Sequence, residues 1–148
     1  MQFPRSAGAT VTDRFNTLTG RWLGRYGYAH SSLVVPFEAE IVDYSGDLTG
    51  LTSEPNTFRF DLGSVLDAVL AGGRGDGAVN FIKRYNGFSH VDDPVYAGLV
   101  NASLTRIEGT WRFPRKPWAT GPFTMMRKPS AAARTSRSDR AGAPEAVR

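Results

Sequence analysis

Residues 20–127 are predicted to form an all-β domain, an eight-stranded antiparallel up-and-down barrel. Apolar and polar residues alternate with a period of two along most of this stretch, which indicates strands with one buried face. Short segments rich in Gly, Asn and Asp separate the alternating runs at hairpin distances. No amphipathic helix lies between the runs, which argues against a parallel βαβ fold. A meander of about eight strands removes its edges by closing on itself.

Each strand is expected to pair with the next one in the sequence. The run at 105–113 has the clearest alternation of apolar and polar residues. The run at 65–71 is compatible with a strand or with two helical turns, and 72–77 is interpreted as a glycine-rich turn. The expected strands span residues 20–28, 35–44, 48–54, 65–71, 78–85, 95–100, 105–113 and 120–127.

The two ends of the chain are expected to lie outside the barrel. Residues 1–19 are mostly polar and are predicted to be a flexible arm. Residues 128–148 contain too few large apolar side chains to offset the entropy of ordering, so a disordered basic tail is expected. This tail has five basic and two acidic residues and therefore carries +3 of the net charge of +4. A barrel that is nearly neutral is not expected to bind nucleic acid.

Composition restricts the class of protein further. A chain of 148 residues suits one domain, and the absence of cysteine excludes disulfides and thiolate metal sites. Neither an apolar signal-peptide core nor a run of about 20 apolar residues is present, so a cytoplasmic protein without a membrane partner is expected.

A set of aromatic side chains is predicted to point into the barrel. These residues either pack as a core or line a cavity for a small molecule, because aromatic walls with a few polar groups are typical of ligand sites. Lys83 is in phase with them and needs a buried partner, for which Glu54 and Asp43 are candidates. The predicted interior contains Trp22, Tyr26, Tyr28, Phe37, Phe81, Tyr85, Tyr96, Trp111 and Phe123, and the candidate ligand-binding residues are Tyr28, Glu54, Lys83, Tyr85, Tyr96 and Trp111.

The opposite face of the middle strands also reads as apolar, although a solvated outer wall should be polar. This pattern favours a homo-oligomer that associates through the barrel wall, or a wall covered by the N-terminal arm. The residues expected to point outward are Leu70, Ile82, Val95, Ala97, Leu99 and Met126.

The catalytic and nucleotide-binding motifs are weak. Gly73, Gly75 and Ala78 match a dinucleotide fingerprint, but an alternating strand follows where a helix is required. His90 lies close to Asp92 and Asp93, which leaves an acid–base pair as one hypothesis, whereas a metal site would need more converging ligands. No catalytic residue, metal or cofactor is therefore assigned.

Several short segments resemble the avidin and streptavidin barrels, which belong to the calycin group together with the lipocalins. The segments at 18–22, 47–50, 79–81, 95–98, 110–111 and 123–124 resemble the first, third, fifth, sixth, seventh and last strands of that family. Thr52 stands where the family pattern has a tyrosine, so the resemblance implies the barrel topology and not a biotin site. The arrangement of Trp22, Gly24 and Tyr26 also resembles small bacterial barrel proteins of uncharacterised activity.

Three functions remain open from the sequence. The first is a barrel that binds a small organic molecule without catalysis. The second is a filled barrel that serves as a structural or interaction module and self-associates through its outer wall. The third is an enzyme that uses His90 with Asp92 or Asp93.

Overall fold

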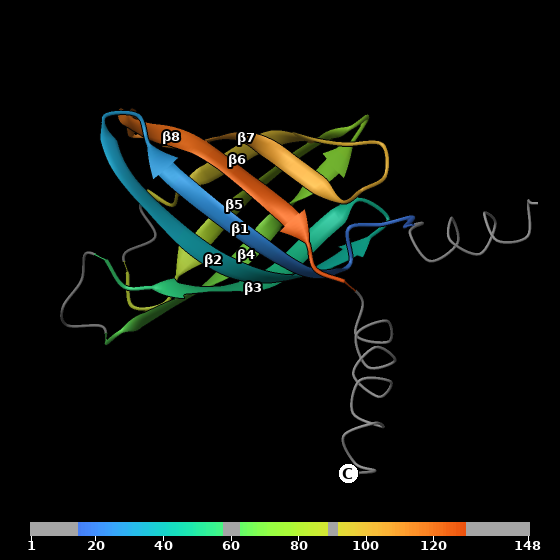
Figure 1. The fold of residues 1–148 in the computed structure, drawn as a ribbon, viewed down its shortest axis with the longest axis horizontal. Coiled ribbons are helices and arrows are strands. Elements are labelled where there is room, and N and C mark those ends of the chain that lie inside the picture. Colours follow the sequence, from blue (N-terminus) through green and yellow to red (C-terminus); the bar gives the residue numbers. More distant parts are fainter. Residues whose placement is uncertain (1–14, 58–62, 89–91, 130–148) are drawn as a thin grey trace, which may run out of the picture.

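The computed structural model describes residues 15–57, 63–88 and 92–129, and these form a closed barrel of eight antiparallel strands (Figure 1). Each strand pairs with the next in sequence, and β1 pairs with β8 to complete the closure. The predicted up-and-down barrel is therefore confirmed. The strands are β1 (Gly20–Tyr28), β2 (Ser31–Tyr44), β3 (Asp47–Pro55), β4 (Val65–Gly75), β5 (Ala78–Tyr85), β6 (Val95–Val100), β7 (Arg106–Phe113) and β8 (Lys116–Arg127).

The uncertain run after residue 65 is a strand, and it is longer than expected. β4 continues to Gly75, so the turn into β5 contains only Asp76 and Gly77, both with positive φ. Gly72 lies inside the strand. A glycine is required there because a Cβ would lie 2.0 Å from the carbonyl oxygen of Asn80 on β5. The glycines that resembled a turn thus allow two strands to approach closely.

The barrel interior is filled by side chains from all eight strands. Phe81 and Tyr96 stack with ring centroids 4.9 Å apart, and Phe123 meets Tyr96 edge-on at 5.0 Å. All of the predicted interior aromatic residues are buried except Tyr28, which is half-buried. Aromatic pairs in these orientations add to the stability gained from burial alone.

The outward assignment of Leu70 is wrong. It pairs with Lys83 across β4 and β5 and is fully buried inside the barrel. A phase error of one residue moves a whole strand face, so Leu66, Ala68 and Leu70 point inward together. The other expected outward residues are half-buried or exposed, with Leu99 at 69% and Met126 at 47%.

One end of the barrel is closed by the chain segment that precedes β1. Leu18 is fully buried there, and its N–H donates to the Asp43 carboxylate at 2.8 Å. Arg127 donates to the carbonyl oxygens of Thr17, Thr19 and Leu104, at 2.5, 2.6 and 3.0 Å. Figure 1 shows the chain entering β1 and leaving β8 at this same end, called the closed end below. The guanidinium group therefore holds the entering segment over the barrel.

No helix in the described part of the chain is both long and apolar enough to cross a membrane.

Candidate ligand site

A buried ion pair with two tyrosines lies toward the end opposite the closed end. The Glu54 carboxylate accepts a hydrogen bond from the Lys83 ammonium at 3.0 Å, and both side chains have no exposed surface. The same carboxylate accepts hydrogen bonds from Tyr85 at 2.9 Å and from Tyr26 at 2.5 Å. Three donors from β1 and β5 thus converge on one acceptor from β3, which compensates much of the cost of burying the charges.

The ammonium group of Lys83 is surrounded by aromatic rings. Its Nζ atom lies 3.9 Å from the ring centroid of Phe37, and 4.8 and 4.9 Å from those of Tyr26 and Tyr96. Ring faces attract a cation more strongly where water is excluded. Burial nevertheless lowers the pKa of Lys83 to about 8, and the Glu54 carboxylate opposes this shift.

The tyrosines of the cluster remain protonated at neutral pH. Burial raises the pKa of Tyr26 and of Tyr85, and the negative charge of Glu54 adds to the shift in both. The pKa of Tyr96 is also raised well above its ordinary value, again mainly by burial. The hydroxyl groups of Tyr26 and Tyr85 therefore remain hydrogen-bond donors to the Glu54 side chain.

The structure brings together three of the six predicted site residues through direct hydrogen bonds: Glu54, Lys83 and Tyr85. Tyr96 contributes its ring to the Lys83 environment. Tyr28 and Trp111 lie beside the cluster, with their ring centroids 5.3 Å apart. The indole N–H of Trp111 donates to the backbone oxygen of Gly27, so this ring is held in place by β1.

Of the two candidate partners for Lys83, Glu54 is the one used. Asp43 lies at the closed end, where Arg74 and the N–H groups of Leu18 and Gly46 donate to it. These hydrogen bonds lower the pKa of Asp43 against the opposing effect of burial. Asp43 therefore accepts hydrogen bonds at the closed end, and Glu54 accepts them toward the opposite end.

Two residues of the site were not singled out as site residues by the sequence. Tyr26 donates the short hydrogen bond to Glu54, and Phe37 supplies the ring nearest to the Lys83 ammonium. Both belonged to the expected inward face, and Tyr26 shares the phase of Tyr28 on β1. The alternation along each strand therefore indicated that both side chains point inward. That they lie beside Lys83 follows only from the way the strands pair.

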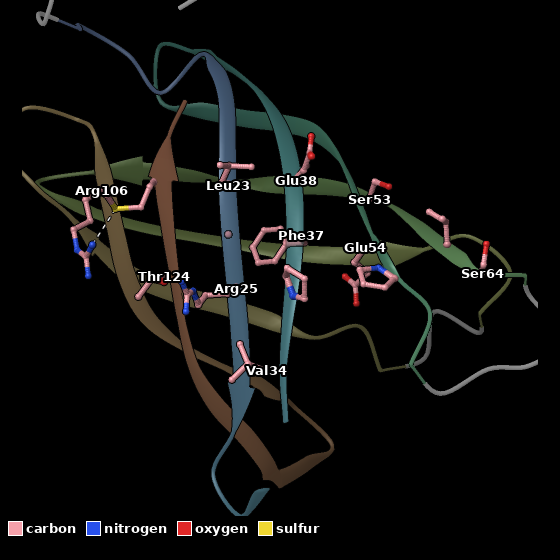
Figure 2. A pocket seen from close by; sticks show the side chains of 15 residues that line it. Leu23, Arg25, Val34, Phe37, Glu38, Ser53, Glu54, Ser64, Arg106 and Thr124 are labelled. Atoms are coloured by element: carbon pink, nitrogen blue, oxygen red, sulfur yellow. Dashed lines mark hydrogen bonds between the residues drawn. The ribbon is translucent and has the colours of Figure 1, made fainter. Parts of the chain in front are cut away.

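A groove opens on the barrel wall where β2 and β3 separate. Their pairing ends at Glu38 and Ser53, although β2 extends further. The groove has a volume of about 1310 Å³, and Glu54 and Phe37 are the two members of the ion-pair cluster that line it. Figure 2 shows Glu54 where the ribbons of the two strands diverge. The other lining residues include the apolar side chains of Leu23, Val34, Pro36, Val65 and Met126, and the side chains of Arg25 and Arg106.

The hydroxyl group of Thr52 has no hydrogen-bond partner, and it is the one such buried side-chain atom among the described residues. Thr52 lies on the inner face, between Ala39 on β2 and Ala68 on β4. An orphaned hydroxyl group in a buried position is a cost to stability.

Of the alternative catalytic site, His90 lies outside the residues that the structure describes, whereas Asp92 and Asp93 lie within them. Asp92 accepts a hydrogen bond from the backbone N–H of Arg115, and Asp93 pairs with Arg84 at 3.0 Å. No group of three or more potential metal ligands occurs in residues 15–57, 63–88 and 92–129.

No family model matches the chain, and no curated protein sequence matches it.

Proposed function

We propose that this barrel binds a small, mainly apolar organic molecule that carries a hydrogen-bond donor, and that it does so without catalysis. The observation that carries the proposal is the groove between β2 and β3, which has Glu54 among its lining residues and the Glu54 carboxylate buried beneath its surface. A concave and mainly apolar surface with one well-placed polar group is the usual form of a small-molecule site.

The chemistry of Glu54 selects the ligand class. A carboxylate offers about four lone-pair positions, and Lys83, Tyr26 and Tyr85 use three of them. The fourth acceptor position would serve a hydroxyl or amine group of a ligand once the groove wall moves aside, because the Glu54 side chain has no exposed surface in this conformation. The apolar side chains of Leu23, Val34 and Val65 would contact the rest of the molecule.

Lys83 supports this role from behind the carboxylate. Lys83 is fully buried and is not among the residues that line the groove, so it contacts the Glu54 carboxylate and not the groove surface. Its ammonium group donates a hydrogen bond to the Glu54 carboxylate, and with Tyr26 and Tyr85 it holds the carboxylate in one position. A preorganised acceptor binds more tightly, because less ordering is required when the ligand arrives.

The resemblance to avidin-like barrels supports the same proposal. Barrels of about eight strands are either filled by side chains or hold one small ligand, as lipocalins and streptavidin do. Here the interior at the level of Lys83 is filled, so we place the ligand in the lateral groove beside Glu54.

Binding can be tested with 2-naphthol, which has an apolar ring system and one donor, and with naphthalene, which lacks the donor. At a concentration of about 100 times Kd a ligand stabilises the folded state by roughly 2.7 kcal/mol. For a domain of this size that corresponds to an increase in Tm of several degrees. We expect 2-naphthol, or another aromatic alcohol or amine in a panel of the same class, to raise Tm more than its counterpart without a donor.

A groove-filling variant provides the structural control. Val65→Trp should abolish the increase in Tm, because this half-exposed side chain lines the groove. Leu99→Trp changes an exposed residue outside the groove and should leave the increase intact. Equal ligand-induced increases in both variants, or no increase with any member of the panel, would contradict the proposal.

A further inference from the structure

The outer wall of the barrel has a row of uncharged side chains that crosses five strands. Strand pairing connects the row laterally, and each member lies on the outer face. The row consists of Val42, Thr49, Ala71, Ile82 and Val95. Val42 is 56% exposed, although an outward sheet face above a filled interior is normally polar.

The adjacent row continues the apolar surface and ends in opposite charges. Leu51 on β3 pairs with Val69 on β4, and these side chains are 60% and 44% exposed. Glu40 on β2 follows Leu51 on one side, and Arg84 on β5 follows Val69 on the other. A contiguous exposed apolar patch with a polar rim is typical of a protein–protein interface.

This surface, which we call the β2–β5 face, is complementary to itself. A two-fold axis parallel to the strands and between β3 and β4 exchanges β2 with β5 and β3 with β4, which leaves Val95 on β6 without a counterpart. It places Leu51 over the partner's Val69, and Glu40 over the partner's Arg84. In a symmetric dimer each such contact occurs twice. We propose that the protein forms a homodimer through the β2–β5 face.

The charged side chains at the rim are paired within the chain but remain accessible to a second copy. Glu40 pairs with Arg21 at 3.4 Å and Arg84 with Asp93 at 3.0 Å, and Glu40, Arg21 and Arg84 all have at least half of their side-chain surface exposed. The Glu40–Arg21 pair is a surface pair that contributes little to stability, so it can rearrange when a second copy approaches. The Asp93 side chain is only 9% exposed, so Arg84 would keep this pair and extend its exposed part to the partner's Glu40. The second copy is the occupant that the pattern favours, because the charges of one face match those of the same face rotated.

Sedimentation equilibrium of the full chain over about 1–100 µM tests the proposal. We expect a species of twice the monomer mass of 16.1 kDa. Leu51→Lys places a charge at the centre of the face and should weaken the dimer by roughly 100-fold or more. Leu99→Lys changes a residue of similar exposure outside the face and should leave the dimer intact. Circular dichroism would check that both variants are folded.

A charge exchange tests the register of the interface. Glu40→Arg should weaken the dimer by roughly tenfold, because like charges would then face each other. Adding Arg84→Glu to the same chain restores opposite charges across the axis and should recover most of the affinity. A monomeric wild-type chain at 100 µM, as expected if residues 1–14 covered the face instead, would overturn the proposal. A dimer that survives Leu51→Lys, or a double variant no tighter than Glu40→Arg, would also overturn it.

Discussion

Breaking the buried Lys83–Glu54 pair should destabilise the barrel far more than removing both charges. Lys83→Met leaves a buried carboxylate, and Glu54→Gln leaves a buried ammonium group without its anion. Removal of one partner from a buried pair costs about 3–5 kcal/mol. Because a domain of this kind is stable by roughly 5–15 kcal/mol, either single change should remove a large part of its stability.

The double variant should recover most of this loss. Glutamine in place of Glu54 is uncharged, and it still offers an oxygen to the hydroxyl groups of Tyr26 and Tyr85. With methionine at Lys83 no unpaired charge remains, so we expect the double variant to lie within about 1–2 kcal/mol of wild type. The difference between the double change and the sum of the singles is the coupling energy.

The assay is urea unfolding followed by tryptophan fluorescence, since the chain contains three tryptophans. Glu108→Gln is a suitable control, because Glu108 is paired with Arg106 but more than half of its side chain is exposed. This control should change the free energy of unfolding by less than about 1 kcal/mol. Additive effects of the two buried substitutions would refute the reasoning, because the pair would then carry no specific coupling.

Lys83→Met should also change the way the free energy of unfolding depends on pH. The pKa of Lys83 is about 8 in the folded protein, compared with about 10.4 in an unfolded chain. Between these values the unfolded state binds more protons, so stability rises with pH by up to ~1.4 kcal/mol per pH unit. Above about pH 10 stability should fall, because the raised pKa values of Tyr26, Tyr85 and Tyr96 keep protons that the unfolded chain releases. Lys83→Met should lose the rise and keep the fall, whereas parallel curves would contradict the assignment.

Three further substitutions test how the barrel is held together, each by urea unfolding. Gly72→Ala should cost about 2–3 kcal/mol because the new methyl group would meet a backbone oxygen at 2.0 Å. Gly75→Ala on the same strand has no atom within 4 Å and should be neutral or slightly stabilising; equal effects would exclude a steric cause. Arg127→Lys should cost about 2 kcal/mol, because a lysine cannot reproduce the three hydrogen bonds of the guanidinium group; an unchanged stability would show that the closed end does not depend on them. Thr52→Val should stabilise the fold by about 1 kcal/mol by removing an orphaned hydroxyl group, whereas Thr110→Val on the exposed face of β7 should have little effect; a destabilising Thr52→Val would indicate a hydrogen-bond partner such as a water molecule.

The sequence alone determined the class of fold and most of the inward face. Alternation with a period of two is a local property of a strand, so the residues from Phe81 to Tyr85 could be assigned to faces without any knowledge of their neighbours. The same local pattern identified Lys83 as an inward lysine in need of a partner. It failed at Leu70, since glycines and small residues around this strand left its phase ambiguous.

Only the tertiary structure decided which groups meet. Glu54 and Asp43 were equivalent candidates in the sequence, and strand pairing placed one beside Lys83 and the other at the closed end. The groove beside Glu54 depends on the point at which β2 and β3 separate, and the β2–β5 face depends on the register of four strands. Register is set by the closure of the whole barrel, because each strand must satisfy two neighbours at once. No single segment of the sequence contains that information.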